Sequence, residues 1–158
     1  MSSPMLERLR SFVSPTKKSE RHIALLVDGP NVIRREMRID LAAVRTQVEK
    51  HGKIKVAKIF LDQYASDKLI EAVTNEGYEP VISTGDVDVT MAVEAMVQAF
   101  NPTIHTLALM TRDIDFRPVL VKAKEMGKET IIIGAEPGFS VALRHTADVV
   151  LIAPTSKA

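Results

Sequence analysis

The sequence contains no cysteine and no tryptophan, and only 4% of its 158 residues are aromatic. The absence of cysteine excludes disulfides, thiolate zinc sites and cysteine nucleophiles, and four scattered histidines disfavour a histidine-rich metal site. A bound metal ion would therefore need oxygen ligands. Because aromatic rings are scarce, any binding of nucleic acid would rest on phosphate contacts rather than on base stacking.

Neither charge of one sign nor a long hydrophobic run dominates the chain. Lys plus Arg number 21 and Asp plus Glu number 20, so the net charge of +1 creates no overall field that attracts a polyanion. No apolar run reaches the roughly 18 residues that a membrane span needs, and the segment Met1 to Arg10 is too polar for a signal peptide. These features predict a cytoplasmic protein that has no membrane partner.

Length and composition predict one folded domain between two short ends. A chain of 158 residues has the usual size of a single domain, and 46% hydrophobic content is enough for a core. Residues 1–20 combine a short amphipathic piece with a tract rich in turn formers, which predicts a flexible N-terminal arm and linker. We expect the domain to cover residues 21–154 and a tail to cover 155–158. The sequence leaves the oligomeric state open, and a homo-oligomer is compatible with it.

Short β-type runs alternate with amphipathic segments of helical length from residue 21 onward, which predicts an α/β fold with a mostly parallel sheet. The predicted strands are Ile23 to Asp28, Ile54 to Leu61, Glu79 to Ser83, Thr106 to Thr111, Glu129 to Ile133 and Asp148 to Ile152. The predicted helices lie at about residues 39–50, 65–76, 88–100, 116–126 and 139–146. Nearly unbroken apolar runs such as residues 23–27 and 131–133 are typical of strands covered on both faces.

Acidic residues gather where ligands bind in such folds, outside the carboxyl ends of the strands. Asp28 ends the first predicted strand, Asp113 and Asp115 follow the fourth, and Asp86 and Asp88 precede the helix after the third. Capping of a helix is a competing explanation for Asp88 and for Asp115, because Asp is a favoured N-cap residue. Several carboxylates at one sheet edge repel one another, however, and call for a cation. Hard oxygen ligands favour Mg²⁺ or Mn²⁺.

Three acidic segments of the chain also resemble the motifs of one protein family. They read LLVDGPN at residues 25–31, VDV at 87–89 with a Glu at 94, and DIDFRP at 113–118. In this order they are similar to the motifs of the NYN domain, a family of the PIN-like nuclease superfamily, and the resemblance extends from about Ile23 to Ile152. It implies a three-layer α/β/α sandwich with five or six strands in the order 3-2-1-4-5, so that the first and fourth strands are neighbours.

The resemblance further implies a metal-dependent ribonuclease that hydrolyses RNA with Mg²⁺ or Mn²⁺. Asp28, Asp113 and Asp115 would be metal ligands, Asp88 would complete the site or orient water, and Asn31 would contact substrate phosphate. All four aspartates are thus the expected catalytic residues.

The third motif departs from the usual pattern Ser-Gly-Asp-x-Asp-Phe, because Thr111 and Arg112 occupy its first two places. Thr111 keeps a hydroxyl. Arg112 replaces a flexible glycine with a cation, which would either pair with substrate phosphate or take the place of the metal electrostatically.

Further candidates rank below these. Glu94 is one, although six helical residues separate it from Asp88 by about 120° around the axis, and a solvated helix face explains it equally well. Asp86, Thr111 and Ser140 are other second-rank site residues.

Arginines near the acidic motifs are the expected RNA contacts. Arg34 and Arg35 follow Asn31 closely and, with Arg112, are expected to bind RNA phosphates; a solvated surface is the alternative for Arg34 and for Arg35. A second reading from a different functional class stays open: a catalytically inactive PIN-like module that binds RNA or a protein.

Overall fold

The computed structural model describes residues 20–32, 38–135 and 139–155, with the backbone alone at residues 31 and 32. Within these ranges six strands form one all-parallel sheet in the order β3-β2-β1-β4-β5-β6. The strands are β1 (His22–Asp28), β2 (Lys53–Asp62), β3 (Glu79–Ser83), β4 (Thr106–Met110), β5 (Glu129–Gly134) and β6 (Val149–Ile152). The predicted α/β class is confirmed, and the predicted order 3-2-1-4-5 continues with β6 beside β5.

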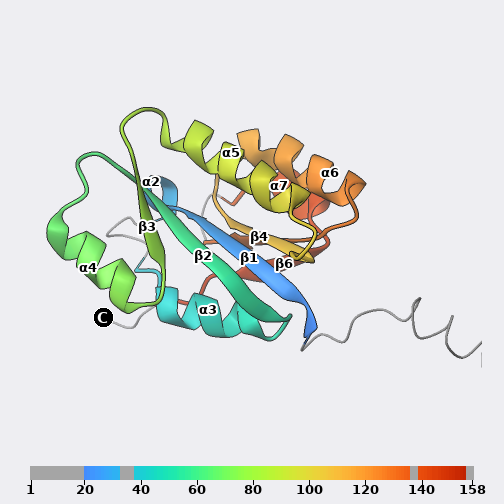
Figure 1. Cartoon of the computed structure of the whole chain (residues 1–158), viewed down its shortest axis with the longest axis horizontal. Helices are drawn as coiled ribbons and strands as arrows, with labels where there is room; N and C mark the ends of the chain where they lie inside the picture. The colour runs from blue at the N-terminus through green and yellow to red at the C-terminus, as the bar shows by residue number, and fades with distance from the viewer. Residues whose placement is uncertain (1–19, 33–37, 136–138, 156–158) are drawn as a thin grey trace, which may run out of the picture.

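Helices cover both faces of the sheet and give three layers (Figure 1). α3 (Leu41–Glu49) and α4 (Asp67–Asn75) lie on one face, whereas α5 (Val87–Phe100), α6 (Arg117–Glu125) and α7 (Val141–Thr146) lie on the other. A one-turn helix α2 (Gly29–Val32) and a 3-10 turn η2 (Ile114–Phe116) complete the order. These two short elements were not predicted from the sequence, and each directly follows an aspartate of the motifs, Asp28 or Asp113.

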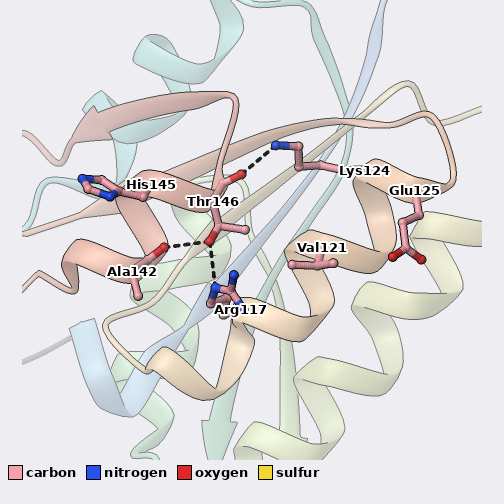
Figure 2. Close-up of a pocket in the computed structure, with 7 residues that line it drawn as sticks. All are labelled: Arg117, Val121, Lys124, Glu125, Ala142, His145 and Thr146. Atoms are coloured by element: carbon pink, nitrogen blue, oxygen red, sulfur yellow. Dashed lines mark hydrogen bonds between the residues drawn. The ribbon is translucent and has the colours of Figure 1, made fainter.

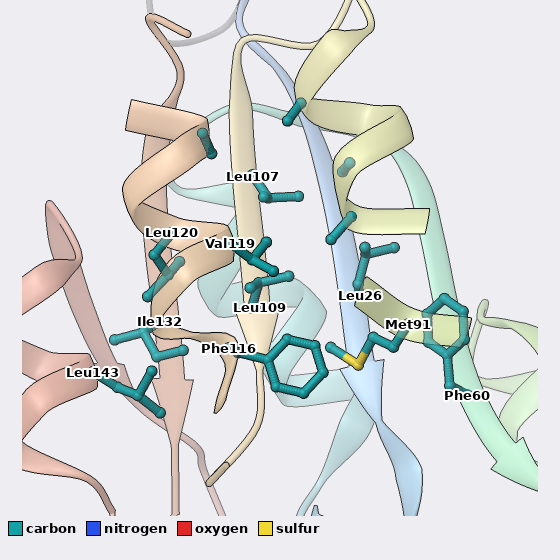
Figure 3. Close-up of a cluster of buried hydrophobic side chains, with 14 of the residues drawn as sticks. Leu26, Phe60, Met91, Leu107, Leu109, Phe116, Val119, Leu120, Ile132 and Leu143 are labelled. Atoms are coloured by element: carbon teal, nitrogen blue, oxygen red, sulfur yellow. The ribbon is translucent and has the colours of Figure 1, made fainter. Parts of the chain in front are cut away.

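The two faces of β1 contribute to two separate cores, because side chains alternate along a strand. Ile23, Leu25 and Val27 pack in the cluster beneath α3 and α4. Leu26 packs in the cluster beneath α5, α6 and α7, where Figure 3 shows it near Leu109 of β4. Burial on both faces explains why the run is continuously apolar, and it makes β1 the rigid centre from which the site is built.

Polar residues define where the helices begin and glycines where two of them end. The residues at four N-termini accept a hydrogen bond from a backbone N–H of the first turn: Asp40, Ser66, Asp86 and Ser140. Gly77 and Gly127, with φ of 89° and 81°, follow α4 and α6 in the left-handed region that glycine adopts without strain. No helix in the described ranges is both long and apolar enough to cross a membrane.

Candidate functional site

The candidate site lies between β1 and β4, at the topological switch point of the sheet. From β1 the chain proceeds to β2 and β3 on one side, and from β4 it proceeds to β5 and β6 on the other. The two strands pair in register up to Val27 and Met110, so Asp28 and Thr111 come next to each other at their carboxyl ends. Open parallel sheets bind ligands at this kind of position.

Asp28 is fully buried at the end of β1. The next residue, Gly29, has no room for a side chain. A Cβ at Gly29 would lie 2.4 Å from the carbonyl oxygen of Phe60 and 2.6 Å from Cδ2 of Leu61. The backbone of α2 therefore begins directly against β2, and the Asp-Gly pair of the first motif has a steric reason.

Thr111 connects the first and third motifs. Its hydroxyl donates a hydrogen bond of 2.9 Å to Oδ2 of Asp28 and accepts one of 3.1 Å from the backbone N–H of Asp113. Thr111 is itself fully buried. The hydroxyl that the sequence retains at this position thus orients the Asp28 carboxylate and holds the start of the third motif against it.

Asp113 caps the 3-10 turn η2. Its Oδ1 accepts a hydrogen bond of 2.9 Å from the backbone N–H of Asp115, whose own side chain is exposed. Capping is therefore a role of Asp113 and not of Asp115, for which the sequence offered it as an explanation. The same shift occurs in the second motif, where Asp86 rather than Asp88 caps α5 and accepts from the Asp88 N–H at 2.9 Å.

Asp88 lies in the first turn of α5 and faces the other two motifs. Burial, a side-chain hydrogen bond with Asp113, and the negative charges of Asp28, Asp113 and Asp86 together raise the pKa of Asp88 from 3.8 to about 7. A charge shifts the pKa of a neighbouring acid only when the two groups lie close together. Three motifs separated by up to 85 positions in the sequence therefore converge on one acidic site.

Comparison with known proteins identifies the family to which this arrangement belongs. The model of the NYN domain matches residues 22–153, which is nearly the whole chain. The chain belongs to the NYN domain family. Members of this family are generally nuclease-like, and the NYN motifs predicted from the sequence are those that meet at the β1 and β4 ends.

This NYN domain is similar to one curated protein in sequence and to one solved structure in fold. An uncharacterized protein of Methanocaldococcus jannaschii is 53% identical over 151 residues, which are 96% of this chain and 61% of that protein. The chain therefore spans less than two thirds of the length of this curated relative. A crystal structure of a protein of unknown function from Vibrio parahaemolyticus matches 87% of this chain and 96% of its own with a TM-score of 0.75 and 19% identity, which supports the fold alone.

The oxygen donors of the NYN site are of the type that a hard divalent cation binds. An acid such as Asp88, whose pKa is raised by burial and by neighbouring carboxylates, is in the environment that a hard cation stabilises. Among the described residues, however, no three His, Cys, Asp or Glu side chains form a ready coordination group. This combination fits Mg²⁺, which keeps several waters and is held by one or two carboxylates, better than an all-protein cage.

Several predicted residues have other partners or lie outside the described ranges. Glu94 forms an ion pair of 2.8 Å with Lys58 and accepts from Gln98, so the structure does not bring it to the acidic site. Ser140 caps α7 by accepting from the Leu143 N–H at 3.4 Å. The side chain of Asn31, and Arg34 and Arg35 altogether, are outside the described part of the chain. Arg112 is half-buried between Thr111 and Asp113.

Two features near the site were missed by sequence reasoning. Asp62 ends β2 beside β1, and the strand-end rule would have found it had the strand been extended by one residue; its Oδ1 accepts from the Tyr64 N–H. The second feature is a groove of about 570 Å³ between α6 and α7, with Arg117, Lys124 and His145 in its lining (Figure 2). Arg117 belongs to the third motif and begins α6, but no sequence periodicity indicated that α7 would lie beside it.

Proposed function

We propose that this NYN domain is a ribonuclease that hydrolyses RNA phosphodiester bonds with Mg²⁺ or Mn²⁺. The observation that carries the proposal is the convergence of acids at the carboxyl ends of β1 and β4, where Thr111 joins Asp28 to the backbone of Asp113 and where burial and the neighbouring acids raise the pKa of Asp88. Such mutual repulsion destabilises the metal-free protein, and structural capping does not require it. Perturbed acids at the switch point of an α/β sheet are typical of functional sites.

In this proposal the acids have separate roles. Asp28 and Asp113 would hold the cation, Thr111 would keep Asp28 oriented, and Asp88 would complete the site or accept the proton of the attacking water. Asp115, which is exposed, would be a further ligand of the cation. The cation, when bound, would lower the pKa of the attacking water and neutralise charge that develops on the phosphate.

Cationic side chains of the α6/α7 groove support an RNA substrate. The groove contains Arg117, which lies in the third motif, and Lys124, which is paired with Asp148 at 3.5 Å, and it can receive a phosphate backbone without base recognition. Arg112 would contact the phosphate nearest the acids. Asn31, Arg34 and Arg35 remain proposed substrate contacts on the basis of their positions in the sequence.

One observation favours a second function, RNA binding without cleavage. The described residues lack a ready three-ligand group, and Arg112 places a cation where the family usually has glycine. A guanidinium there could neutralise the carboxylates in place of a metal.

Calorimetric titration with Mn²⁺ and an RNA cleavage assay on the same sample separate the two functions. The variant is Asp28→Asn, and the matched control is Glu71→Gln, which removes one negative charge from α4 on the opposite face of the sheet. We expect the wild type and Glu71→Gln to bind Mn²⁺ and cleave, and Asp28→Asn to do neither. RNA binding without Mn²⁺ binding or cleavage in the wild type would contradict the nuclease proposal and support the binding module.

A further inference from the structure

Tyr64 is an aromatic residue that contributes little to the fold. It is 83% exposed and belongs to neither core cluster. The other tyrosine, Tyr78, is buried, and its hydroxyl donates a hydrogen bond of 2.8 Å to the carbonyl oxygen of Leu41. An aromatic side chain stabilises a protein mainly through the large area that it buries. The ring of Tyr64 buries little in the folded chain, so contact with a ligand is a role that it can still take.

Tyr64 lies at the edge of the sheet where the strands end and where the acids of the NYN site gather. Phe60 of β2 pairs with Asp28 of β1, and β2 continues for two residues to Asp62. The rise and spacing of strands then separate the Cα atoms of Asp62 and Asp28 by about 8 Å. Tyr64 follows in the next turn, on the order of 10 Å from Asp28. Figure 1 shows this turn at the same end of the sheet as α2, which follows β1.

Hydrogen bonds hold the turn that carries Tyr64. Oδ1 of Asp62 accepts from the Tyr64 N–H at 2.9 Å, and the carbonyl oxygen of Asp62 accepts from the Ala65 N–H at 3.2 Å. Ser66 then caps α4. Because the backbone is held and a tyrosine has only two side-chain torsions, little conformational entropy is lost when the ring binds a flat partner.

The order of the strands places the acids between Tyr64 and the α6/α7 groove. β1 and β4, whose ends lead to the acids, lie between β2, which leads to Tyr64, and β5, which leads to α7. A strand of RNA along this edge would therefore contact the groove on one side of the acids and Tyr64 on the other. Phe100, which is 69% exposed, lies at the opposite edge, because α5 returns the chain to the start of β4.

We propose that Tyr64 stacks on one base of a single-stranded RNA substrate, close to the phosphate that the acids bind. This role rests on the proposed function, because it requires RNA at the acidic site. Every base has a π face, so stacking tolerates any base at this position. In a duplex the bases are stacked inside the helix, so Tyr64 favours unpaired RNA over paired RNA. Tyr64 thus adds a base contact to the phosphate contacts that the low aromatic content predicts.

Fluorescence anisotropy with a labelled single-stranded RNA, in metal-free buffer to exclude cleavage, measures the contribution of the ring. Tyr64→Ala should raise Kd by about 5- to 100-fold. Tyr64→Phe keeps the ring and should bind like the wild type, whereas Tyr64→Leu keeps only an apolar side chain and should bind nearly as weakly as Tyr64→Ala. Phe100→Ala is the matched control, since it removes an exposed ring from the opposite edge, and its Kd should be unchanged. The Kd for an RNA duplex should be the same for the wild type and Tyr64→Ala.

Tyr64→Trp gives a direct signal from this position, because the natural chain contains no tryptophan. A base stacked on the indole should quench its fluorescence. We expect quenching by single-stranded RNA and none by an RNA duplex. Phe100→Trp is the matched control and should be quenched by neither, because the opposite edge of the sheet is not on the RNA path.

The outcomes separate this role from the proposed function. A wild type that binds single-stranded RNA no more tightly than Tyr64→Ala does would overturn the stacking and leave the nuclease proposal in place. Equal quenching of Tyr64→Trp and Phe100→Trp would overturn it too, because RNA would then contact both edges alike. Equal losses of single-strand and duplex binding in Tyr64→Ala would overturn the preference for unpaired RNA. A wild type that binds no RNA would overturn the proposed function and the role of Tyr64 with it.

Discussion

The Thr111 hydroxyl donates a hydrogen bond of 2.9 Å to the Asp28 carboxylate across the ends of two neighbouring strands. Both residues are fully buried, and the same hydroxyl receives the N–H of Asp113. A single oxygen atom thereby aligns the first and third NYN motifs. Threonine can replace the serine that the family usually has at this position, because it supplies the same hydroxyl.

Thr111→Val keeps the shape of the side chain and removes this hydroxyl. We expect the free energy of unfolding to fall by about 1–3 kcal/mol, because the buried Asp28 loses a donor and the Asp113 N–H loses its acceptor. Urea denaturation measures the change. Thr111→Ser should stay close to the wild type, and a Val variant as stable as the wild type would show that the bond contributes nothing to folding.

Asp113→Asn and Asp113→Ala separate the charge of this residue from its capping role. Asn can still accept from the Asp115 N–H, whereas Ala cannot and should lose about 1 kcal/mol. We expect the Asn variant to unfold in metal-free buffer with the wild-type free energy or a higher one, since repulsion with Asp88 is relieved. It should nevertheless lose RNA cleavage. Wild-type cleavage by Asp113→Asn would remove Asp113 from the proposed mechanism.

The stability of the metal-free protein should decrease as pH rises from about 4 to about 7, and Asp88 should cause part of this decrease. Its pKa is raised to about 7 in the folded protein, by burial and then by Asp113 and Asp28, while in the unfolded chain it is near 3.8. Between these values the folded state binds more protons than the unfolded state, so rising pH favours unfolding. Urea denaturation as a function of pH measures this slope.

Asp88→Asn should flatten that slope, whereas Asp67→Asn should not. Asp67 is the matched control because it occupies the first turn of α4 as Asp88 occupies the first turn of α5. Identical pH dependence of the wild type and Asp88→Asn would contradict the raised pKa.

Divalent metal should stabilise the folded protein. Ions that bind only the folded site contribute about 2.7 kcal/mol at a hundredfold excess over Kd. For a chain of this length this corresponds to an increase in Tm of about 5–10 °C. Differential scanning calorimetry in millimolar Mn²⁺ should detect the increase in the wild type and in Glu71→Gln but not in Asp28→Asn. An equal increase in all three would indicate that Mn²⁺ binds elsewhere.

Arg117→Ala should weaken RNA binding in a manner that depends on salt. Loss of one phosphate contact reduces the slope of log K against log salt by about 0.7 for a single strand. Fluorescence anisotropy with labelled RNA in metal-free buffer measures the slope without cleavage. Lys68→Ala, which removes an exposed cation from α4 on the opposite face, is the control. Equal slopes for both variants and the wild type would exclude the α6/α7 groove as the RNA path.

Local sequence patterns were sufficient to predict the strands and most helices. The apolar runs of β1 and β5 identify strands that are covered on both faces, and predicted strand ends agree with the structure to within one residue at all six strands. The acids of the three motifs were identified in the same way, because each follows a strand or precedes a helix. The one-turn helix α2 escaped prediction because four residues cannot show a helical period.

Tertiary structure decided which of these acids meet and what else each one does. Asp88 and Glu94 lie on one helix, yet α5 directs Asp88 to Asp113 and Glu94 to Lys58, since six residues rotate them by about 120°. Asp86 and Asp113 are the capping residues, because each lies directly before its turn and accepts from the N–H two residues later. The sequence determined the chemistry available at the end of each strand. Only the packing of parallel strands and crossover helices determined which of these groups share a site, because contacts between distant residues depend on the path of the whole chain.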